Sequence, residues 1–189
     1  MKKLFLVAAV AVLLCLLLSV AASAQYDEES SKLNLKLGFF MPIGSTAKDI
    51  VSKSWSLEQL TYDSKRDETG RPIVQFNFGL MGSMDSDRSS IFTLGVDRFF
   101  WKASKGDSSL YYGFGAGLYK MKVHDKFRIV EAKKLNTGVD LFVGYNFHDA
   151  YMLELRGLLV RPITLGSGAN ALDVNLSGVM ICASTRRLF

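Results

Sequence analysis

Five charged residues lie where the surrounding sequence alternates between apolar and polar side chains. They are Lys36, Asp97, Asp140, Glu154 and Arg156. Because side chains of a strand alternate between its two faces, each of the five falls on the face opposite to its apolar neighbours. Buried charges are costly unless they are paired, and here two cations meet three anions. The pattern predicts an ion-pair network inside a barrel and leaves open a path for protons or ions.

A basic segment extends from residue 120 to residue 134. Its cations are Lys120, Lys122, Lys126, Arg128, Lys133 and Lys134. Only Asp125 and Glu131 oppose them. If the segment faces outward, this excess of cations is suited to phosphate groups of lipopolysaccharide, and a merely solvated loop is the alternative. No groove-reading helix or basic-aromatic module is evident, so nucleic acid is not an expected partner.

Candidates for catalysis are few. His124 and His148 lie beside Asp125 and Asp149 in predicted connections. Neither histidine has a serine at a spacing that would place both side chains on one strand face, which catalysis by serine and histidine would need. The two histidines and Cys182 are distant in sequence, so they predict no metal site. We expect no enzymatic activity and no cofactor.

The first 24 residues have the pattern of an export signal. Two lysines precede an apolar run over residues 4–20, which ends at the small residues Ala22 and Ala24. A signal peptide at residues 1–24, removed on export, would leave residues 25–189 as one barrel domain. A retained N-terminal anchor is the alternative, because the run is near the lower limit for a membrane helix.

The apolar residues of the remaining chain are spread by alternation. Although 49% of the chain is hydrophobic, no later segment approaches the ~18 consecutive apolar residues of a transmembrane helix. Removal of the signal would leave Cys182 as the only cysteine, so a disulfide framework is not expected. Internal repeats and heptads are also absent. These features indicate one compact β domain.

Seven segments alternate with a period of two. They lie at residues 33–41, 74–82, 92–100, 110–119, 138–147, 151–160 and 172–176. An even number of strands is expected, and the candidate for the eighth is Ser54 to Tyr62. There Leu60 and Tyr62 have the opposite parity to Trp55 and Leu57, so we expect a bulge or a short strand. The predicted fold is all-β, an eight-stranded antiparallel up-and-down transmembrane β-barrel.

The connections between these strands differ in length. The expected periplasmic turns are residues 63–71, 102–108 and 148–150, and the expected external loops are residues 42–53, 82–89, 123–134 and 161–171. The external set is mostly longer or more polar, as in membrane barrels.

Alternation alone does not decide which face of the barrel is inside. The less apolar face carries many strand glycines, which are Gly38, Gly79, Gly95, Gly113, Gly115, Gly117, Gly138 and Gly144. A narrow lumen has more use for them than a solvated surface does. We therefore expect the apolar face to contact lipid, and a soluble periplasmic barrel with the faces reversed is the alternative.

Glycine-rich and aromatic segments recur along the alternating stretches. They are Leu37-Gly38-Phe39-Phe40-Met41-Pro42, Tyr112-Gly113-Phe114-Gly115-Ala116-Gly117-Leu118-Tyr119, and Val139-Asp140-Leu141-Phe142-Val143-Gly144-Tyr145 followed by Leu153-Glu154-Leu155-Arg156-Gly157. In these segments the chain resembles the small outer-membrane β-barrel superfamily, the OmpA-like, OmpX-like and OmpW-like membrane domains, over most of residues 33–183. Such proteins usually end in an aromatic residue after an apolar alternation. Phe189 fits this pattern, whereas Thr185 and Arg187 depart from it.

The resemblance implies a fold and a location more than an activity. We expect a porin-like, monomeric barrel in the outer membrane of a Gram-negative cell envelope, with a structural, surface-interaction or adhesion role. Its expected partners are outer-membrane lipids, lipopolysaccharide and the outer-membrane assembly machinery.

Two other functions remain open. One is a channel for small hydrophobic molecules, as the OmpW-like resemblance implies, with the apolar residues Phe40, Met81, Phe142 and Leu158 facing the lumen. The other is an enzyme that modifies lipid A, for which His124 would be needed.

Overall fold

The computed structural model describes residues 32–85, 89–102, 108–125, 127, 130–147, 151–168 and 171–185. Several features expected from the sequence lie outside these residues. They are the export signal at residues 1–24, Lys126, Arg128, His148, Arg187 and Phe189.

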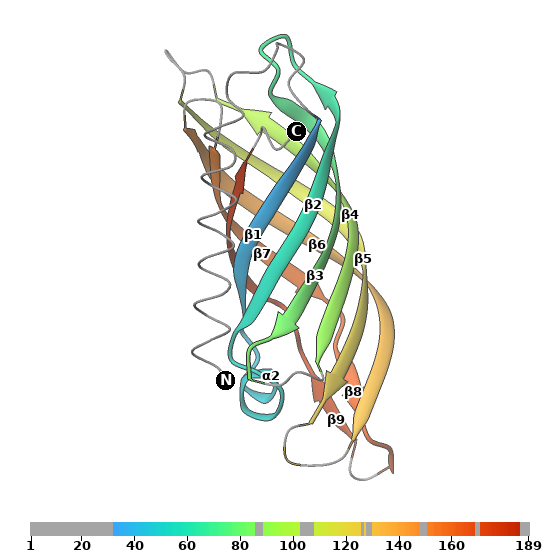
Figure 1. Cartoon of the computed structure of the whole chain (residues 1–189). Helices are drawn as coiled ribbons and strands as arrows, with labels where there is room; N and C mark the ends of the chain where they lie inside the picture. The colour runs from blue at the N-terminus through green and yellow to red at the C-terminus, as the bar shows by residue number, and fades with distance from the viewer. Residues whose placement is uncertain are drawn as a thin grey trace.

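Eight strands close into one barrel (Figure 1). They are β1 (Leu33–Pro42), β2 (Trp55–Arg66), β3 (Pro72–Ser83), β4 (Ser90–Trp101), β5 (Ser109–His124), β6 (Glu131–Phe147), β7 (Tyr151–Val160) and β10 (Gly178–Thr185). Every pair of neighbours is antiparallel, and β10 closes the ring by pairing with β1. The expected eight-stranded antiparallel up-and-down barrel is confirmed.

Three short elements gather at one end of the barrel, at the bottom of Figure 1. They are the helix α2 (Ser45–Ile50) and the two-stranded sheet of β8 (Ile163–Leu165) and β9 (Leu172–Val174). We call this end the loop end, and we call the opposite end, where residues 67–71 connect β2 to β3, the turn end. None of the described helices has the length and apolar character needed to cross a membrane.

The last barrel strand is not the one that the sequence predicted. Residues 172–176 alternate, yet β9 pairs with β8, and β10 begins only at Gly178. The amide of Ser177 donates to the side-chain oxygen of Asn175 at 2.9 Å, and this local turn interrupts the alternation. Val174 and Leu176 are fully buried at the loop end, so their predicted contact with lipid is wrong.

The uncertain strand at Ser54 to Tyr62 is present, but the bulge expected within it is absent. From Trp55 to Tyr62, β2 pairs in unbroken register with both β1 and β3. Trp55 and Leu57 point into the lumen, whereas Leu60 and Tyr62 are exposed on the outside. The parity change in the sequence therefore reflects apolar residues on both faces of a regular strand. The register shifts only further along, between Asp63 and Arg66.

Two expected connections are shorter in the structure. The strand β2 continues to Arg66, and β5 and β6 are joined by residues 125–130 alone. As a result β5 and β6 have 16 and 17 residues, more than the other strands of the barrel.

Strand glycines make room for aromatic rings in the lumen. Gly144 on β6 pairs with Tyr111 on β5, and Gly113 on β5 pairs with Phe142 on β6. A Cβ at either glycine would overlap the ring of its paired residue. Because an eight-stranded barrel is only wide enough for its side chains, each ring lies over a position that has none. Gly157 on β7 differs, since it is exposed and a Cβ there would lie 4.0 Å from the carbonyl oxygen of Leu141.

The glycine packing predicts that Gly144→Ala destabilises the barrel. The added methyl group must displace the Tyr111 ring, and overpacking of this kind costs about 1–3 kcal/mol. Gly157→Ala, on the neighbouring strand but outside the lumen, is the matched control and is expected to change little. Urea titration of the folded barrel in detergent micelles measures both, and equal midpoints for the two variants would contradict the prediction.

Candidate functional site

Arg156 lies at the centre of a group of buried charges in the lumen. From β7 its Nε donates to Glu154 Oε1 at 3.0 Å. Its Nη1 donates to Asp97 Oδ1 at 3.0 Å and to Asp140 Oδ1 at 2.8 Å, and its Nη2 donates to Asp97 Oδ2. One guanidinium therefore joins carboxylates from β4, β6 and β7, through the planar fork of donors that distinguishes arginine from lysine.

Lys36 extends this group to β1. Its Nζ lies 3.1 Å from Glu154 Oε1 and 3.9 Å from Asp97 Oδ2. The structure thus brings together all five charged residues that the sequence placed on one face, and we call them the lumenal ion network. Their side chains are at most 5% exposed. The network carries two positive and three negative formal charges, a net of one negative charge.

Two tyrosines complete the network. Tyr111 donates its hydroxyl to Glu154 Oε2, and Tyr119 donates its hydroxyl to Asp140 Oδ2, each at 3.4 Å. The sequence placed both tyrosines on the glycine-rich face, but it did not assign them a role. The only available signal was that a residue with a polar tip shared a face with the charges.

The surroundings of Arg156 are shaped by two further residues. The Phe142 ring centroid lies 4.4 Å from the guanidinium carbon, which places the cation over an aromatic face. Gly115 leaves the space that two carboxylates occupy, because a Cβ there would overlap Asp97 and would lie 2.7 Å from Asp140 Oδ1. The absence of a side chain at Gly115 lets both acids approach the same guanidinium.

Apolar clusters lie on both sides of the lumenal ion network. The larger cluster fills the loop end, and its buried members are Phe40, Ala47, Val51, Trp55, Leu57, Met81, Ile91, Tyr119, Met121, Val123, Leu158, Val160, Ile163, Leu165, Val174, Leu176, Met180 and Cys182. The smaller cluster lies towards the turn end and contains Phe99, Tyr111, Phe142 and Met152, against which Trp101 packs. Beside it, β1–β3 contribute the buried polar side chains Asn34, Thr61, Gln75 and Asn77.

The four apolar residues considered for a channel belong to these clusters. Phe40, Met81 and Leu158 are part of the cluster at the loop end, and Phe142 is part of the smaller one. Each is at most 4% exposed. They pack against other side chains of the lumen.

Hydrogen bonds tie the loops at the loop end to one another. The amide of Ile43 donates to the Ser177 carbonyl at 2.8 Å, and the amide of Met84 donates to the Ser54 carbonyl at 3.0 Å. Asp85 Oδ2 accepts from the Lys53 amide at 3.1 Å. Together with α2, β8 and β9, these contacts form a cap over the apolar cluster at the loop end.

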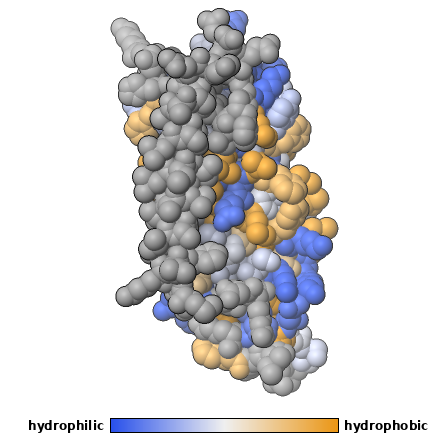
Figure 2. Space-filling model, viewed as in Figure 1, coloured by the Kyte–Doolittle hydropathy of each residue, from blue (hydrophilic) through white to orange (hydrophobic). Residues whose placement is uncertain are grey.

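The outer face of the barrel is apolar. Its exposed large side chains include Phe39, Leu60, Phe76, Phe78, Leu80, Leu94, Phe114, Val139, Leu141, Leu153, Leu155, Leu159 and Ile181. Leu141 is 68% exposed and Leu159 is 60% exposed. Figure 2 shows hydrophobic side chains over much of the middle of the visible strands, with hydrophilic ones among them and towards both ends. Charged residues on this face include Arg98, near the end of β4, and Glu58, which is paired with Leu37 and Leu80 on the neighbouring strands.

The basic segment is divided by the structure. Lys120 and Lys122 on β5 and Lys133 on β6 share the outward parity of their strands. Glu131 lies between two of them: its Oε2 is 3.4 Å from Lys122 Nζ, and its Oε1 is 3.0 Å from Lys133 Nζ. Lys134 instead donates to the Pro162 carbonyl at 3.2 Å. Lys126 and Arg128 lie outside the described residues, so three of the six predicted cations form an outward patch.

His124 lies next to a serine that sequence spacing did not identify. Its amide donates to Ser89 Oγ at 2.9 Å, and Ser89 Oγ in turn donates to its carbonyl at 3.5 Å. Both contacts use the backbone of His124, so they do not activate the serine through the imidazole. Within the described ranges, no three His, Cys, Asp or Glu side chains are grouped closely enough to hold a metal ion.

Comparison with known proteins identifies the architecture. No family model and no curated protein sequence matches the chain. Among solved structures, the crystal structure of Neisserial surface protein A is similar, with a TM-score of 0.50 and 10% sequence identity over 84% of this chain and 99% of that chain. That protein is a small eight-stranded barrel of the outer membrane. At this identity the likeness shows the fold alone.

The lumenal ion network predicts that Arg156→Met destabilises the barrel strongly. The variant leaves three buried acids with only Lys36 as a cation, and breaking a buried ion pair from one side costs about 3–5 kcal/mol. Urea titration followed by tryptophan fluorescence measures the loss. Lys133→Met, which removes the charge of a side chain that is 68% exposed, is the control and is expected to cost about 1 kcal/mol at most.

A compensating variant separates charge from packing. Adding Asp97→Asn and Asp140→Asn to Arg156→Met removes two uncompensated carboxylates, so part of the lost stability is expected to return. If the triple variant is no more stable than Arg156→Met, the charges are not the cause of the loss.

Proposed function

We propose that the chain is a non-enzymatic barrel of the outer membrane, with a structural or surface-interaction role in the cell envelope. In this proposal residues 1–24 direct export, and the outer-membrane assembly machinery inserts the monomeric barrel. The observation that carries the proposal is the inverted distribution of polarity, with large apolar side chains exposed outside and paired charges buried inside.

The inverted polarity suits lipid better than water. A barrel in water would expose a continuous apolar surface, whereas monomeric soluble proteins rarely expose patches of more than a few hundred Å². A membrane barrel has the opposite requirement, because lipid covers the outer face and the lumen is polar. The soluble alternative would need Leu141 and Leu159 to face a core, yet both are more than half exposed.

The length of the strands supports the same location. Seven of the eight barrel strands have 10 or more residues, and β10 has eight up to the last described residue, whereas a tilted membrane strand needs ~9–11. Near the turn end the exposed aromatic residues include Tyr62, Phe100, Tyr112, Tyr145, Phe147 and Tyr151. Such residues are typical of an interfacial girdle.

Trp101 lies near the same end but does not belong to this girdle. Its ring packs against Phe99 and Tyr111, and its indole N–H donates to the Pro72 carbonyl at 2.7 Å. It therefore contributes to the packing of the turn end.

The packing of the loop end supports a scaffold more than a passage. The cap and the apolar cluster beneath it occupy one end of the lumen, and the lumenal ion network occupies the middle. In this proposal the cap, with α2 and the β8–β9 sheet, is the surface for interaction or adhesion.

Location is tested by fractionating expressing cells and running the outer-membrane fraction on gels with and without boiling. The expected result is a band in that fraction that shifts on heating, since closed barrels resist detergent and migrate differently when folded. A soluble periplasmic protein without a shift would overturn the proposal.

Closure of the lumen is tested by conductance in planar bilayers, with a general porin as positive control. The wild-type protein is expected to show no steady channel steps. Phe40→Ala and Phe142→Ala each remove one ring and are expected to stay closed, because the lumenal ion network remains between the two positions. Currents in the wild type that change with either substitution would favour the channel.

A further inference from the structure

The outward patch of Lys120, Lys122 and Lys133 borders the apolar outer face directly. Lys122 and Lys133 are register partners across β5 and β6. Lys120 is paired with Leu135 on one side and Phe92 on the other, which are 63% and 37% exposed. The patch thus begins where the apolar surface ends, at the level that lipid headgroups would occupy around a membrane barrel.

The patch carries an excess of positive charge. Glu131 is the one acid that ion-pairs with it among the described residues, and its carboxylate contacts Lys122 and Lys133 but not Lys120. Three cations against one anion leave two net positive charges, which favour the binding of an anionic group. Lysines near an anionic lipid surface contribute favourably to binding, and their long apolar stems can lie along the apolar face.

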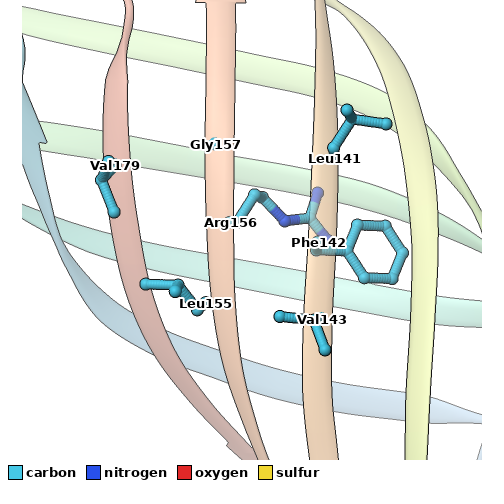
Figure 3. Close-up of a pocket in the computed structure, with 7 residues that line it drawn as sticks. All are labelled: Leu141, Phe142, Val143, Leu155, Arg156, Gly157 and Val179. Atoms are coloured by element: carbon cyan, nitrogen blue, oxygen red, sulfur yellow. The ribbon is translucent and has the colours of Figure 1, made fainter.

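An apolar groove lies on the same outer face, closer to the middle of the barrel. It has a volume of about 380 Å³ and is lined by Leu141, Phe142, Val143, Leu155, Arg156, Gly157 and Val179 (Figure 3). Figure 3 shows the side chains of Leu141 and Val143 on β6, Leu155 on β7 and Val179 on β10 around the bare position of Gly157. The guanidinium of Arg156 is engaged inside the lumen, so the groove itself is apolar.

Gly157 is not required by the packing of the barrel. A Cβ at this position would meet nothing closer than 4.0 Å, whereas side chains border it on both neighbouring strands. The groove exists because this one outward position carries no side chain.

The spacing between patch and groove matches half a bilayer. Lys133 and Leu141 are both on β6, eight positions apart. At ~3.3 Å per residue and a strand tilt of ~40°, the two differ in depth by ~20 Å. Half of a bilayer with its headgroup region is also ~20 Å thick. The same tilt also separates them by ~17 Å around the barrel, so an acyl chain that reaches the groove from the patch must run along β6.

We propose that this outer face is a binding site for an anionic lipid with a phosphate headgroup. The phosphate lies against Lys120, Lys122 and Lys133, and one acyl chain lies in the groove over Gly157. This lipid site rests on the proposed membrane location. It adds to that proposal the chemistry of the lipid and the side of the barrel that binds the lipid.

The headgroup contact is tested with the full-length protein in non-ionic detergent, by native mass spectrometry with dimyristoyl phosphatidic acid. Changing Lys120, Lys122 and Lys133 to Gln is expected to weaken binding ten- to a hundred-fold. The matched control changes the exposed Lys32, Lys65 and Lys102 at the turn end to Gln and is expected to stay within two-fold. Equal losses in both variants would mean attraction without a site and would overturn the proposal.

The acyl contact is tested separately by Gly157→Leu, which fills the groove. This variant is expected to bind dimyristoyl phosphatidic acid several-fold more weakly and to bind the dihexanoyl lipid as the wild type does, because only the longer chain reaches the groove. Unchanged binding of the long lipid, or an equal loss for both lipids, would show that the groove holds no chain.

Failure of the lipid site and failure of the proposed membrane location give different experimental results. Each variant is first checked for the heat-dependent gel shift, which reports the folded membrane barrel. A wild-type protein without the shift would overturn the membrane location. A normal shift without the expected lipid discrimination would overturn only the lipid site.

Discussion

Closure of the strand ring is the constraint on which the rest of the structure depends. Because β10 pairs with β1, every barrel strand has a neighbour on both sides, and the backbone hydrogen bonds of the ring are satisfied within it. Closure with eight strands also makes the lumen so narrow that side chains fill it. Every inward residue must therefore fit the residues on the opposite and neighbouring walls. The aromatic rings of Tyr111 and Phe142 are accommodated only because their register partners, Gly144 and Gly113, have no side chains.

Within this narrow space, the charges link strands that are distant in sequence. Arg156 joins Asp97, Asp140 and Glu154, and Lys36 connects the group to β1. The desolvation of these charges is offset because the guanidinium uses Nε and both terminal nitrogens, and two tyrosine hydroxyls donate to the acids as well. Such a network stabilises one strand register over others, since a shift by one residue would turn the charges towards the outer face. The network thus joins β1, β4, β6 and β7 across the middle of the lumen.

The same alternation gives the outside of the barrel its two regions. Along β5 and β6 the outward residues are apolar for most of the strand and then become basic near the loop end. In the proposed membrane location, the apolar region faces acyl chains and the basic region faces phosphate headgroups. The cap at the loop end is held by contacts among loops and by the apolar cluster below it, so it forms a surface of defined shape without a disulfide bond.

The sequence by itself determined six of the eight barrel strands, the two faces of each and the set of charges on the inner face, because alternation is a local property that a strand keeps wherever it lies. Only the tertiary structure decided which apolar residues are buried where both faces are apolar. Trp55 and Leu57 point inward because β2 is held between two neighbours, and Leu176 is buried because its segment folds over the end of the barrel. Likewise, Lys134 turns to the Pro162 carbonyl, a contact that depends on a loop 28 residues away. Contacts of this kind are set by ring closure and loop packing, which no local pattern encodes.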